Sequence, residues 1–294
     1  MTDHPPTEAR SSKSGGLDLL NTSELVALIA GDQRGAVDAV LLASAAIAQA
    51  VDEIVLRLRN GGTLHYVGAG SSGRIATLDA SEMPPTFGTP QDLVRSHVAG
   101  GTAALVRSME GAEDDAEAGD AVVRDFVRPQ DAVIGISASG SAPFVVTAIE
   151  RAKAQGSYSV ALTSVADSAL ARCATHAIVL DTGAEVLTGS TRLKAGTAQK
   201  VALNAISTAV MVRLGKVYDN LMVDVVASNR KLRVRAARLV ERLAGVDEAR
   251  ARYLLGLAHG RVKVAVVMQR HDLDASAAQA LLDDRDGALR PLLR

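Results

Sequence analysis

The stretch VGAGSSGRIATLDASEMPPTFG, residues 67–88, decides the fold class. A loop of glycine and serine separates a preceding apolar run, LHYV, from a following helical pattern. Such a loop favours bound phosphate, because the first backbone N–H groups of a helix are unpaired and the helix dipole is positive there. Glu82 lies about one helix length further on, near the expected end of the helix and directly before Met-Pro-Pro. A phosphate does not favour a carboxylate nearby, so a shared site would use this acid for chemistry on the rest of the ligand.

Short β-type runs alternate with helical patterns along most of the chain. This alternation is typical of βαβ units, so the expected fold is α/β, a parallel sheet with helices on both faces. Ligands of such proteins bind where the carboxyl ends of strands lead into helices. The expected strands are residues 63–67, 93–98, 132–136, 159–162 and 177–180. The expected helices include one capped by Asn21 or Thr22, with Glu24 completing a capping box, and residues 36–59, 143–155 and 196–214.

The sequence divides into three expected parts. Residues 1–16 are polar and are expected to form a flexible tail, and residues 17–233 the α/β domain. The β-type signal disappears near Val234, so residues 234–294 are expected to form a small helical subdomain. Three short helices are expected in it, separated by Gly245, Gly260 and residues 271–273.

Composition excludes several classes of function. The net charge of -1 leaves no basic surface for nucleic acid, and aromatic residues, at 2%, are too few for stacking of bases or sugar rings. One cysteine, Cys173, excludes an internal disulfide and fits a reducing compartment. No apolar run reaches the roughly 18 residues of a membrane span, and the first residues lack the apolar stretch of a secretion signal. We therefore expect a cytoplasmic protein without nucleic-acid or membrane partners.

A second serine-rich loop, SASGSAP, residues 137–143, follows the apolar run AVIGI. Serine and glycine are ordinary turn residues, so one such loop alone is weak evidence of a site. Two of them at successive strand-to-helix junctions favour a pocket for the phosphate of a polyhydroxylated ligand. The candidate phosphate-binding residues are Gly70, Ser71 and Ser72 in the first loop and Ser137, Ser139, Gly140 and Ser141 in the second.

Neither loop predicts a nucleotide cofactor. GAGSSG formally satisfies the GxGxxG pattern of dinucleotide-binding proteins, but no clear acidic residue ends the second strand to hold a ribose, and there is no Walker lysine. The six histidines show no metal-ligand spacing. We expect no cofactor and no metal.

A third segment, GAEVLTGSTRLKAGTAQK, residues 183–200, follows the last expected strand. It is either a solvated connection or a lid that supplies charge to the same pocket. A connection this dense in Gly, Ser and Thr is usually functional when it is ordered, which favours the lid. Its candidate ligand-binding residues are Glu185, Ser190 and Lys194.

Several motifs carry a resemblance to a known family. DASEMPPTFG, EGAEDD, the two serine loops, GAEVLTGSTRLKAGTAQK and NLMVDVVASN are similar to motifs of the N-acetylmuramic acid 6-phosphate etherases, which have the sugar isomerase (SIS) fold. The similarity extends from about Leu17 to the C-terminus. It implies a lyase that removes D-lactate from N-acetylmuramic acid 6-phosphate and leaves N-acetylglucosamine 6-phosphate, in muramic acid catabolism and cell-wall recycling. It also implies that no metal or nucleotide is needed, and that a homodimer shares its active site between subunits.

The resemblance also assigns a catalytic pair. The glutamate of the DASE-x-PP motif is Glu82, to which we assign the proton donated to the leaving oxygen, and that of the GAED motif is Glu113, assigned as the base at C2. The two roles can be exchanged; the pair is the firmer assignment. Without the resemblance, nothing in the run EGAEDDAEAGD selects Glu113, because acidic runs are usually solvated. The etherases usually have threonine at the position of Ser71 and SGRTP where this chain has SGSAP, so Ser141 replaces an arginine.

Other functions compete with the etherase. A phosphosugar isomerase would use the same phosphate loops and a base at C2, but would not require both glutamate motifs. A non-catalytic sugar-phosphate sensor, like the glucokinase regulatory protein of this fold, is expected to lack one of the two acids. A DNA-binding regulator would need a basic helix-turn-helix, for which the residues before Leu17 are too few. The two intact glutamate motifs favour the etherase.

Overall fold

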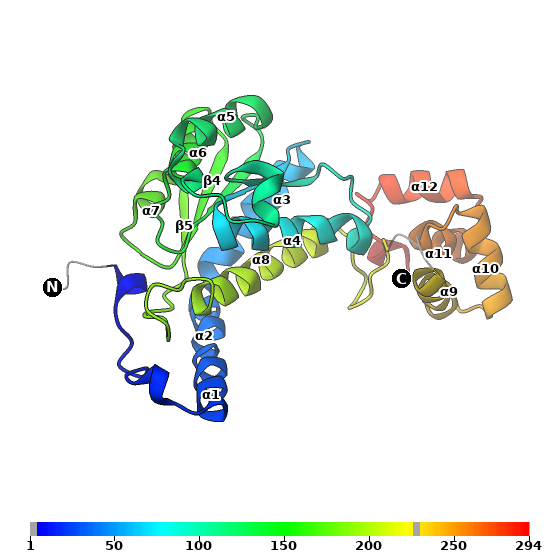
Figure 1. The fold of residues 1–294 in the computed structure, drawn as a ribbon. Helices are drawn as coiled ribbons and strands as arrows, with labels where there is room; N and C mark the ends of the chain where they lie inside the picture. The colour runs from blue at the N-terminus through cyan, green and yellow to red at the C-terminus, as the bar shows by residue number, and fades with distance from the viewer. Residues whose placement is uncertain (1–4, 226–229, 294) are drawn as a thin grey trace. The chain divides into compact units, whose positions relative to one another are not determined.

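The computed structural model describes residues 5–225 and 230–293. By its internal contacts the chain forms two compact units, whose elements are coloured along the chain in Figure 1. Met1–Ala80 and Asp92–Ser207 form the first, which we call the sheet unit. Ser81–Gln91 and Thr208–Arg294 form the second, which we call the helical unit. The sequence-based boundary between residues 233 and 234 stays a prediction.

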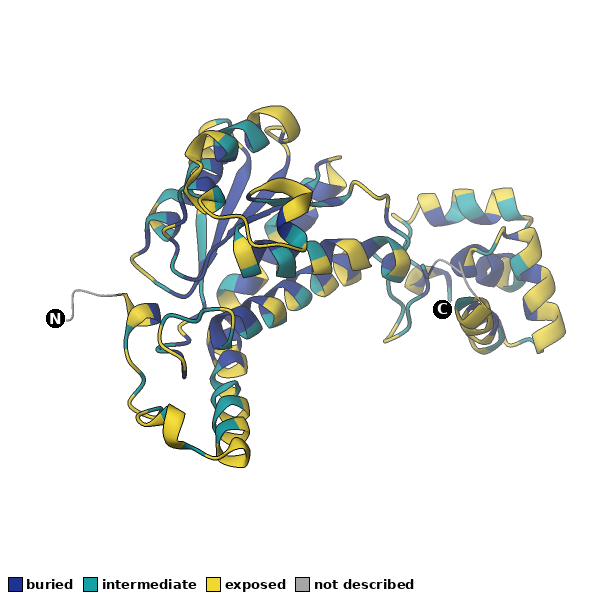
Figure 2. Cartoon of the chain, in the orientation of Figure 1, coloured by how far each residue is buried: buried dark blue, intermediate teal, exposed yellow. Residues whose placement is uncertain are grey.

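The sheet unit is built on five parallel strands in the order β2-β1-β3-β4-β5. All five expected strands are confirmed: β1 Leu64–Gly68, β2 Val94–Val98, β3 Ala132–Ile136, β4 Tyr158–Thr163 and β5 His176–Val179. The central strands β1, β3 and β4 are buried along their whole length, as Figure 2 shows. Strands covered on both faces read as continuous apolar runs rather than as alternating ones, which explains the runs in the sequence.

Helices cover both faces of the sheet (Figure 1). On one face, Val67, Val133 and Ala161 share an apolar cluster with residues of three helices: α5 Ala116–Phe126, α6 Pro143–Ala154 and α7 Ala169–Cys173. Tyr66 points to the opposite face, because successive residues of a strand alternate. Three further helices lie there: α3 Ser44–Arg59, α4 Gly70–Phe87 and α8 Lys194–Arg213.

The chain begins with α1 Thr22–Asp32 and α2 Arg34–Leu42. The capping box is confirmed: Asn21 Oδ1 accepts a hydrogen bond from the backbone N–H of Glu24, and Glu24 Oε2 accepts one from that of Asn21, each at 3.0 Å. Apart from the side chain of Asp32 at its end, which is 8% exposed, no part of α1 is buried, and the structure describes all of its residues. This helix therefore gains little stability from packing within the chain, and its cap matters accordingly.

The expectation of one helix over residues 36–59 was wrong. The structure ends α2 at Leu42 and starts α3 at Ser44, with a bend of 57° between the preceding helices and α3. No proline or glycine marks the bend, and the spacing of buried residues continues through it: Ala36, Ala39, Ala43, Ile47 and Ala50. The helical period alone could not reveal a bend that tertiary packing of α3 against the sheet imposes.

Helix α4 runs past the position at which the sequence predicted its end. It includes Pro84 and Pro85 and ends at Phe87, so Glu82 lies inside the helix and not at its end. Proline lacks an N–H group, so Pro84 and Pro85 cannot donate to the carbonyls of Ala80 and Ser81. The backbone N–H of Gly88 donates to the carbonyl of Pro84 at 3.0 Å and closes the last turn.

In its described residues, the helical unit contains four longer helices besides the ends of α4 and α8: α9 Arg230–Ala244, α10 Glu248–Leu257, α11 Val262–His271 and α12 Ala275–Asp283. The last three confirm the three short helices expected from the sequence. Within residues 5–225 and 230–293, no single helix has the length and apolar character needed to cross a membrane, although one bent pair, Thr22–Leu42 with Ser44–Arg59, meets those two criteria together.

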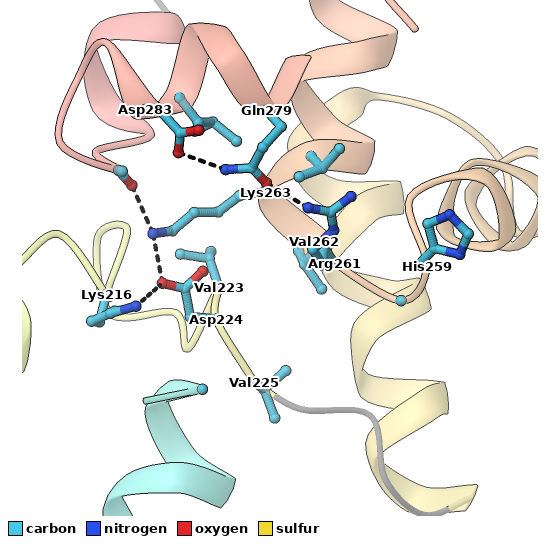
Figure 3. A pocket seen from close by; sticks show the side chains of 15 residues that line it. Lys216, Val223, Asp224, Val225, His259, Arg261, Val262, Lys263, Gln279 and Asp283 are labelled. Carbon is cyan, nitrogen blue, oxygen red and sulfur yellow. Dashed lines mark hydrogen bonds and ion pairs between the residues drawn. The ribbon is translucent and has the colours of Figure 1, made fainter. Parts of the chain in front are cut away.

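A cavity of about 480 Å³ lies in the helical unit (Figure 3). Lys263 is buried beside it, and its Nζ donates to Asp224 Oδ2 at 2.7 Å and to the carbonyls of Gly215 and Gly287 at 2.8 and 2.7 Å. Burial lowers the pKa of Lys263, and the negative charge of Asp224 opposes that shift. Lys216 Nζ lies 3.3 Å from the same carboxylate.

Other polar side chains of this cavity also pair with one another. Gln279 accepts a hydrogen bond from Arg261 Nη1 at 2.7 Å and donates one to Asp283 at 2.7 Å (Figure 3). None of the sequence-predicted site residues, all of which the structure describes, lines this cavity. It is therefore not the site that the serine loops predict.

Candidate functional site

The two serine loops follow neighbouring strands at the centre of the sheet. β1 is hydrogen-bonded to β2 on one side and to β3 on the other, and the loops leave the carboxyl ends of β1 and β3. The strand order reverses its direction between these two strands, which is where open α/β sheets bind ligands. The topology therefore brings both predicted phosphate loops to one edge of the sheet, at its switch point.

The first serine loop is closely packed at its base. A Cβ atom at Gly68 would lie 2.8 Å from Gly73 N, and one at Gly73 would lie 2.8 Å from Gly68 O, so neither position accepts a side chain. Gly70 has a φ of 53°, a left-handed conformation that suits glycine. Ser72 is buried, and its Oγ donates to Gln199 Oε1 at 2.9 Å. That bond engages the hydroxyl hydrogen of Ser72 within the protein, and the backbone N–H of Ser72 lies in the first turn of α4, where helices lack internal acceptors.

The second serine loop is closed by its own hydroxyl groups. The backbone N–H of Gly140 donates to Ser137 Oγ at 3.1 Å, and the Oγ atoms of Ser139 and Ser141 lie 2.8 Å apart. Gly140 has a φ of 66°, and a Cβ atom there would collide with the side chain of Ser168. Ser137 and Gly140 are buried whereas Ser141 is exposed. The loop is a compact turn that presents its last serine outward, before Pro143 opens α6 as predicted.

Two charged residues of the third segment, Glu185 and Lys194, are engaged within the protein. Glu185 is fully buried, and its two carboxylate oxygens accept from the backbone N–H groups of Lys194 and Ala195 at 3.0 and 2.8 Å. Glu185 therefore caps the N-terminus of α8 and complements its dipole. Lys194 Nζ donates to both oxygens of Asp32, at 3.1 and 3.0 Å, and to the carbonyl of Ala184 at 2.8 Å. Ser190, the remaining candidate of this segment, is half-buried.

A cavity of about 330 Å³ adjoins the first serine loop. Gly70 and Arg74, from the start of α4, line one part of it, and Glu113 lines another. Glu113 is exposed and lies in the single 3-10 turn η4 Ala112–Asp114. The structure thus brings a residue of the first predicted phosphate loop and one predicted catalytic glutamate to one cavity of the sheet unit. Glu82, also exposed, belongs to the helical unit.

A buried carboxylate that the sequence reasoning missed lies one helical turn before Glu82. Asp79 accepts hydrogen bonds from Tyr66 Oη at 3.0 Å, from Asn204 Nδ2 at 2.6 Å and from Ser207 Oγ at 3.0 Å. These bonds join β1, α4 and α8. Burial, and then the charge of Asp79, raise the pKa of Tyr66 well above its usual value. The place of Asp79 in the DASE motif, on the same helix as Glu82, is the signal that could have identified it.

Metal ligation has no candidate in the described part of the chain. Within residues 5–225 and 230–293, no group of three or more His, Cys, Asp or Glu side chains is arranged to hold a metal ion.

Two family descriptions match parts of the chain. Residues 46–153 match the glucokinase regulatory protein N-terminal SIS domain, and residues 105–209 match the SIS domain. The structure is similar to that of a phosphoheptose isomerase from Francisella tularensis, with a TM-score of 0.51 and 20% identity over 66% of this chain and 100% of that chain. At that identity the likeness supports the α/β fold and nothing finer.

Proteins named N-acetylmuramic acid 6-phosphate etherase are similar over most of the chain. The one from Symbiobacterium thermophilum is 52% identical over 89% of this chain and 87% of its own length. The one from Trichormus variabilis is 46% identical over 98% of this chain and 94% of its own, and the one from Synechococcus sp. strain CC9902 is 48% identical over 99% and 92%. Identity of this size over nearly the whole of both chains means that the chain belongs to the N-acetylmuramic acid 6-phosphate etherase family.

Proposed function

We propose that the protein cleaves the D-lactyl ether of N-acetylmuramic acid 6-phosphate and releases D-lactate and N-acetylglucosamine 6-phosphate. The observation that carries this proposal is the 52% identity to the etherase of Symbiobacterium thermophilum over 89% of the chain. The presence of both motif glutamates, Glu82 and Glu113, supports it further. The protein is then a carbon–oxygen lyase of muramic acid catabolism and cell-wall recycling, and we place it in the cytoplasm.

The chemistry needs one acid and one base. Opening of the sugar ring places an aldehyde at C1, which makes the C2 proton acidic. Glu113 removes that proton, a C2–C3 double bond forms, the C3–O bond breaks, and Glu82 protonates the departing lactate oxygen. Water then adds at C3 and gives its proton to Glu82, while Glu113 returns a proton to C2. One water molecule is consumed, one lactate is released, and both glutamates regain their starting protonation states.

The two serine loops hold the 6-phosphate in this proposal. Their positions at the carboxyl ends of β1 and β3, at the switch point of the sheet, support a shared ligand. The backbone N–H groups at the start of α4 supply donors without a charged side chain. The hydroxyl of Ser141, exposed at the end of the second loop, replaces the arginine usual in the family, so this chain binds phosphate with hydroxyl and N–H donors at that position.

A homodimer completes the site in this proposal. Glu82 and Glu113 are both exposed in the single chain, whereas a carboxylic acid that donates a proton at neutral pH requires a partly dry surrounding. α1 and α2 expose Val26, Leu41 and Leu42, of which Leu42 is 85% exposed. Apolar surface of this kind is typical of protein interfaces. A second copy that covers it would bring further residues to the site.

The first experiment measures D-lactate released from N-acetylmuramic acid 6-phosphate by the purified protein beside Glu82→Gln and Glu113→Gln. A positioned acid or base typically contributes about 10²–10⁴-fold, so each variant should lose activity of that size and keep the circular dichroism spectrum of the wild type. Glu117→Gln is the matched control, because Glu117 is an exposed carboxylate of the same acidic run. It should retain full activity.

Exchange of the C2 proton in deuterated water separates the two roles. Glu113→Gln should lose both exchange and lactate release, whereas Glu82→Gln should lose lactate release and retain exchange. The reverse pattern exchanges the roles of acid and base. A well-folded wild type that binds the sugar phosphate and releases no lactate contradicts the etherase and favours a sensor, the function class suggested by the match of residues 46–153.

A further inference from the structure

Arg74 ties the start of α4 to the connection that carries Glu113. Its Nε lies 3.0 Å from the carbonyl oxygen of Ala104 and 3.3 Å from that of Leu105, and its Nη2 donates to the carbonyl of Arg107 at 3.1 Å. The side chain is half-buried and lines the same cavity of about 330 Å³ as Glu113. A guanidinium is planar and offers its donors in a fixed fork, so carbonyls bound in this way are held in one arrangement.

The connection itself has few buried side chains. Between β2 and α5 the chain forms only two short 3-10 turns, η3 Gly101–Leu105 and η4 Ala112–Asp114, and residues 106–111 between them are all exposed. Ala104 is the single buried residue in the stretch 100–113, all of which the structure describes. Segments with few buried contacts open locally at low free energy. The hydrogen bonds from Arg74 therefore contribute a large part of what keeps this segment in one conformation.

We propose that Arg74 is a positioning residue that holds Glu113 at a fixed separation from the phosphate loop. We call the Arg74 side chain, with its hydrogen bonds to the carbonyls of residues 104, 105 and 107, the clamp. α4 begins at Gly70, so the first serine loop and the clamp occupy the first two turns of one helix. A ligand whose phosphate is held at Gly70–Ser72 then meets Glu113 at a place that the Arg74 side chain sets. This inference rests on the proposed function of Glu113 as the base at C2.

The chemistry requires an accurately placed base. The base must reach the C2 proton within hydrogen-bond distance, while the phosphate that anchors the substrate is attached at the other end of the sugar. A misplacement of about 1 Å can reduce a rate about 100-fold without loss of binding. Loss of the clamp should therefore lower kcat and leave KM nearly unchanged, because the phosphate loop remains in place.

The experiment compares Arg74→Met and Arg74→Lys with the wild type. Arg74→Met should lower kcat for lactate release by about 10–100-fold, with KM within about threefold, and should slow C2 exchange by the same factor. Arg74→Lys keeps the charge, but a single ammonium cannot bridge the carbonyls of Ala104, Leu105 and Arg107 in the same way, so it should restore only a small part of the loss.

Arg57→Met is the matched control. Arg57 also donates to two backbone carbonyls, those of Pro129 and Gly156, at 3.1 and 3.4 Å. These residues precede β3 and β4, at the amino ends of the strands and away from the serine loops. The control should lose as much thermal stability as Arg74→Met and keep kcat within about twofold of the wild type.

Amide hydrogen–deuterium exchange without substrate gives a readout independent of activity. Residues 104–113 of Arg74→Met should exchange at least about tenfold faster than in the wild type, and β3 should be unchanged. If the wild type releases no lactate, the proposed function fails while this measurement still decides the clamp. Unchanged exchange in residues 104–113, or an unchanged kcat, overturns the inference. A large rise in KM with loss of inorganic phosphate binding overturns it too, because Arg74 would then be a ligand contact.

Discussion

Lys194 in the sheet unit and Lys263 in the helical unit hold two long connections of the chain in the same way. Each side chain is buried, and each Nζ donates to one carboxylate and to backbone carbonyl oxygen: that of Ala184 for Lys194, and those of Gly215 and Gly287 for Lys263. Their carboxylates differ. The side chain of Asp32 is 8% exposed, and Lys194 is its cation among the described residues, whereas that of Asp224 is 20% exposed and has a second cation in Lys216.

This difference between the two carboxylates shows what determines the loss of stability when a buried lysine is removed. A buried ammonium must find acceptors for its three N–H groups inside the protein, and both lysines do so. The cost of removing the lysine then depends on the surroundings of the carboxylate that stays behind. Asp32 would be left buried without a cation, and Asp224 would keep one.

Lys194→Met should have the largest effect. It removes one partner of a buried ion pair, which typically costs about 3–5 kcal/mol, because the remaining charge stays uncompensated. The measurement is the free energy of unfolding in urea. Lys200→Met, at an exposed position of the same helix, is the matched control and should change that free energy by less than about 0.5 kcal/mol. A loss below 1 kcal/mol for Lys194→Met would show that water reaches Asp32 and would remove the contrast between the two lysines.

Lys263→Met should cost about 2 kcal/mol. Asp224 keeps Lys216, but the half-buried carbonyls of Gly215 and Gly287 lose their donor, which costs less for each than the about 1–3 kcal/mol of a fully buried unsatisfied acceptor. Native-state hydrogen exchange of α11 measures the loss in the helical unit directly. A loss equal to that of Lys194→Met would mean that burial of the amine, and not a second cation at the carboxylate, governs the cost.

Lowering the pH should measure how much the Asp131 carboxylate stabilises the sheet unit, without any mutation. Burial alone would raise the pKa of Asp131, but the nearby His65 ring, whose Nε2 lies 3.4 Å from Asp131 Oδ2, and hydrogen bonds from the backbone N–H groups of Arg128 and Thr63 outweigh burial and lower it to about 2. The unfolded chain binds the proton at higher pH, so the contribution of Asp131 is complete above about pH 4 and is lost as the pH falls to about 2. The loss is about 2 kcal/mol. Exchange protection of β3 and β4 as a function of pH measures it, and Asp131→Asn should abolish that slope.

Lys216→Met should have the smallest effect, about 0.5 kcal/mol. The side chain is 27% exposed and lies at the edge of the cavity in Figure 3, and partly exposed ion pairs contribute little. Combined with Lys263→Met, however, it should cost more than the sum of the two single losses, because Asp224 then has no cation left. A strictly additive double variant in urea unfolding would contradict the shared role of the two lysines.

The sheet could be predicted from the sequence because each strand is a short apolar run bounded by turn residues. β3, for example, is AVIGI between Asp131 and the second serine loop. The bend at Ala43 could not be predicted, since the spacing of buried residues runs through it without a break. The continuation of α4 through Pro84 and Pro85 could not be predicted either, because the sequence does not distinguish prolines in the last turn of a helix from prolines that follow it.

The candidate site was predictable only where function is carried by short motifs. The serine loops and the glutamate motifs are local patterns, and the topology places the two loops at adjacent strand ends. Glu185 and Lys194 look like ligand residues because they stand among Gly, Ser and Thr, yet the structure engages both internally. The partner of Lys194, Asp32, is 162 residues away in the chain. The clamp made by Arg74 and the pair formed by Lys263 and Asp224 depend on distant contacts in the same way.

The hydrogen bonds of Asp79 can form only late in synthesis of the chain, because two of its three partners lie far downstream in the sequence. Its partner Tyr66 is already present when Asp79 is made, but Asn204 follows by 125 residues. At about 5–20 residues per second, the carboxylate waits on the order of ten seconds on the ribosome for its remaining donors. Until α8 emerges, this carboxylate cannot be buried with all its partners, and its face of the sheet stays open. A product cut short before Ser207 would keep that opening permanently and would be a lasting target for cellular proteases.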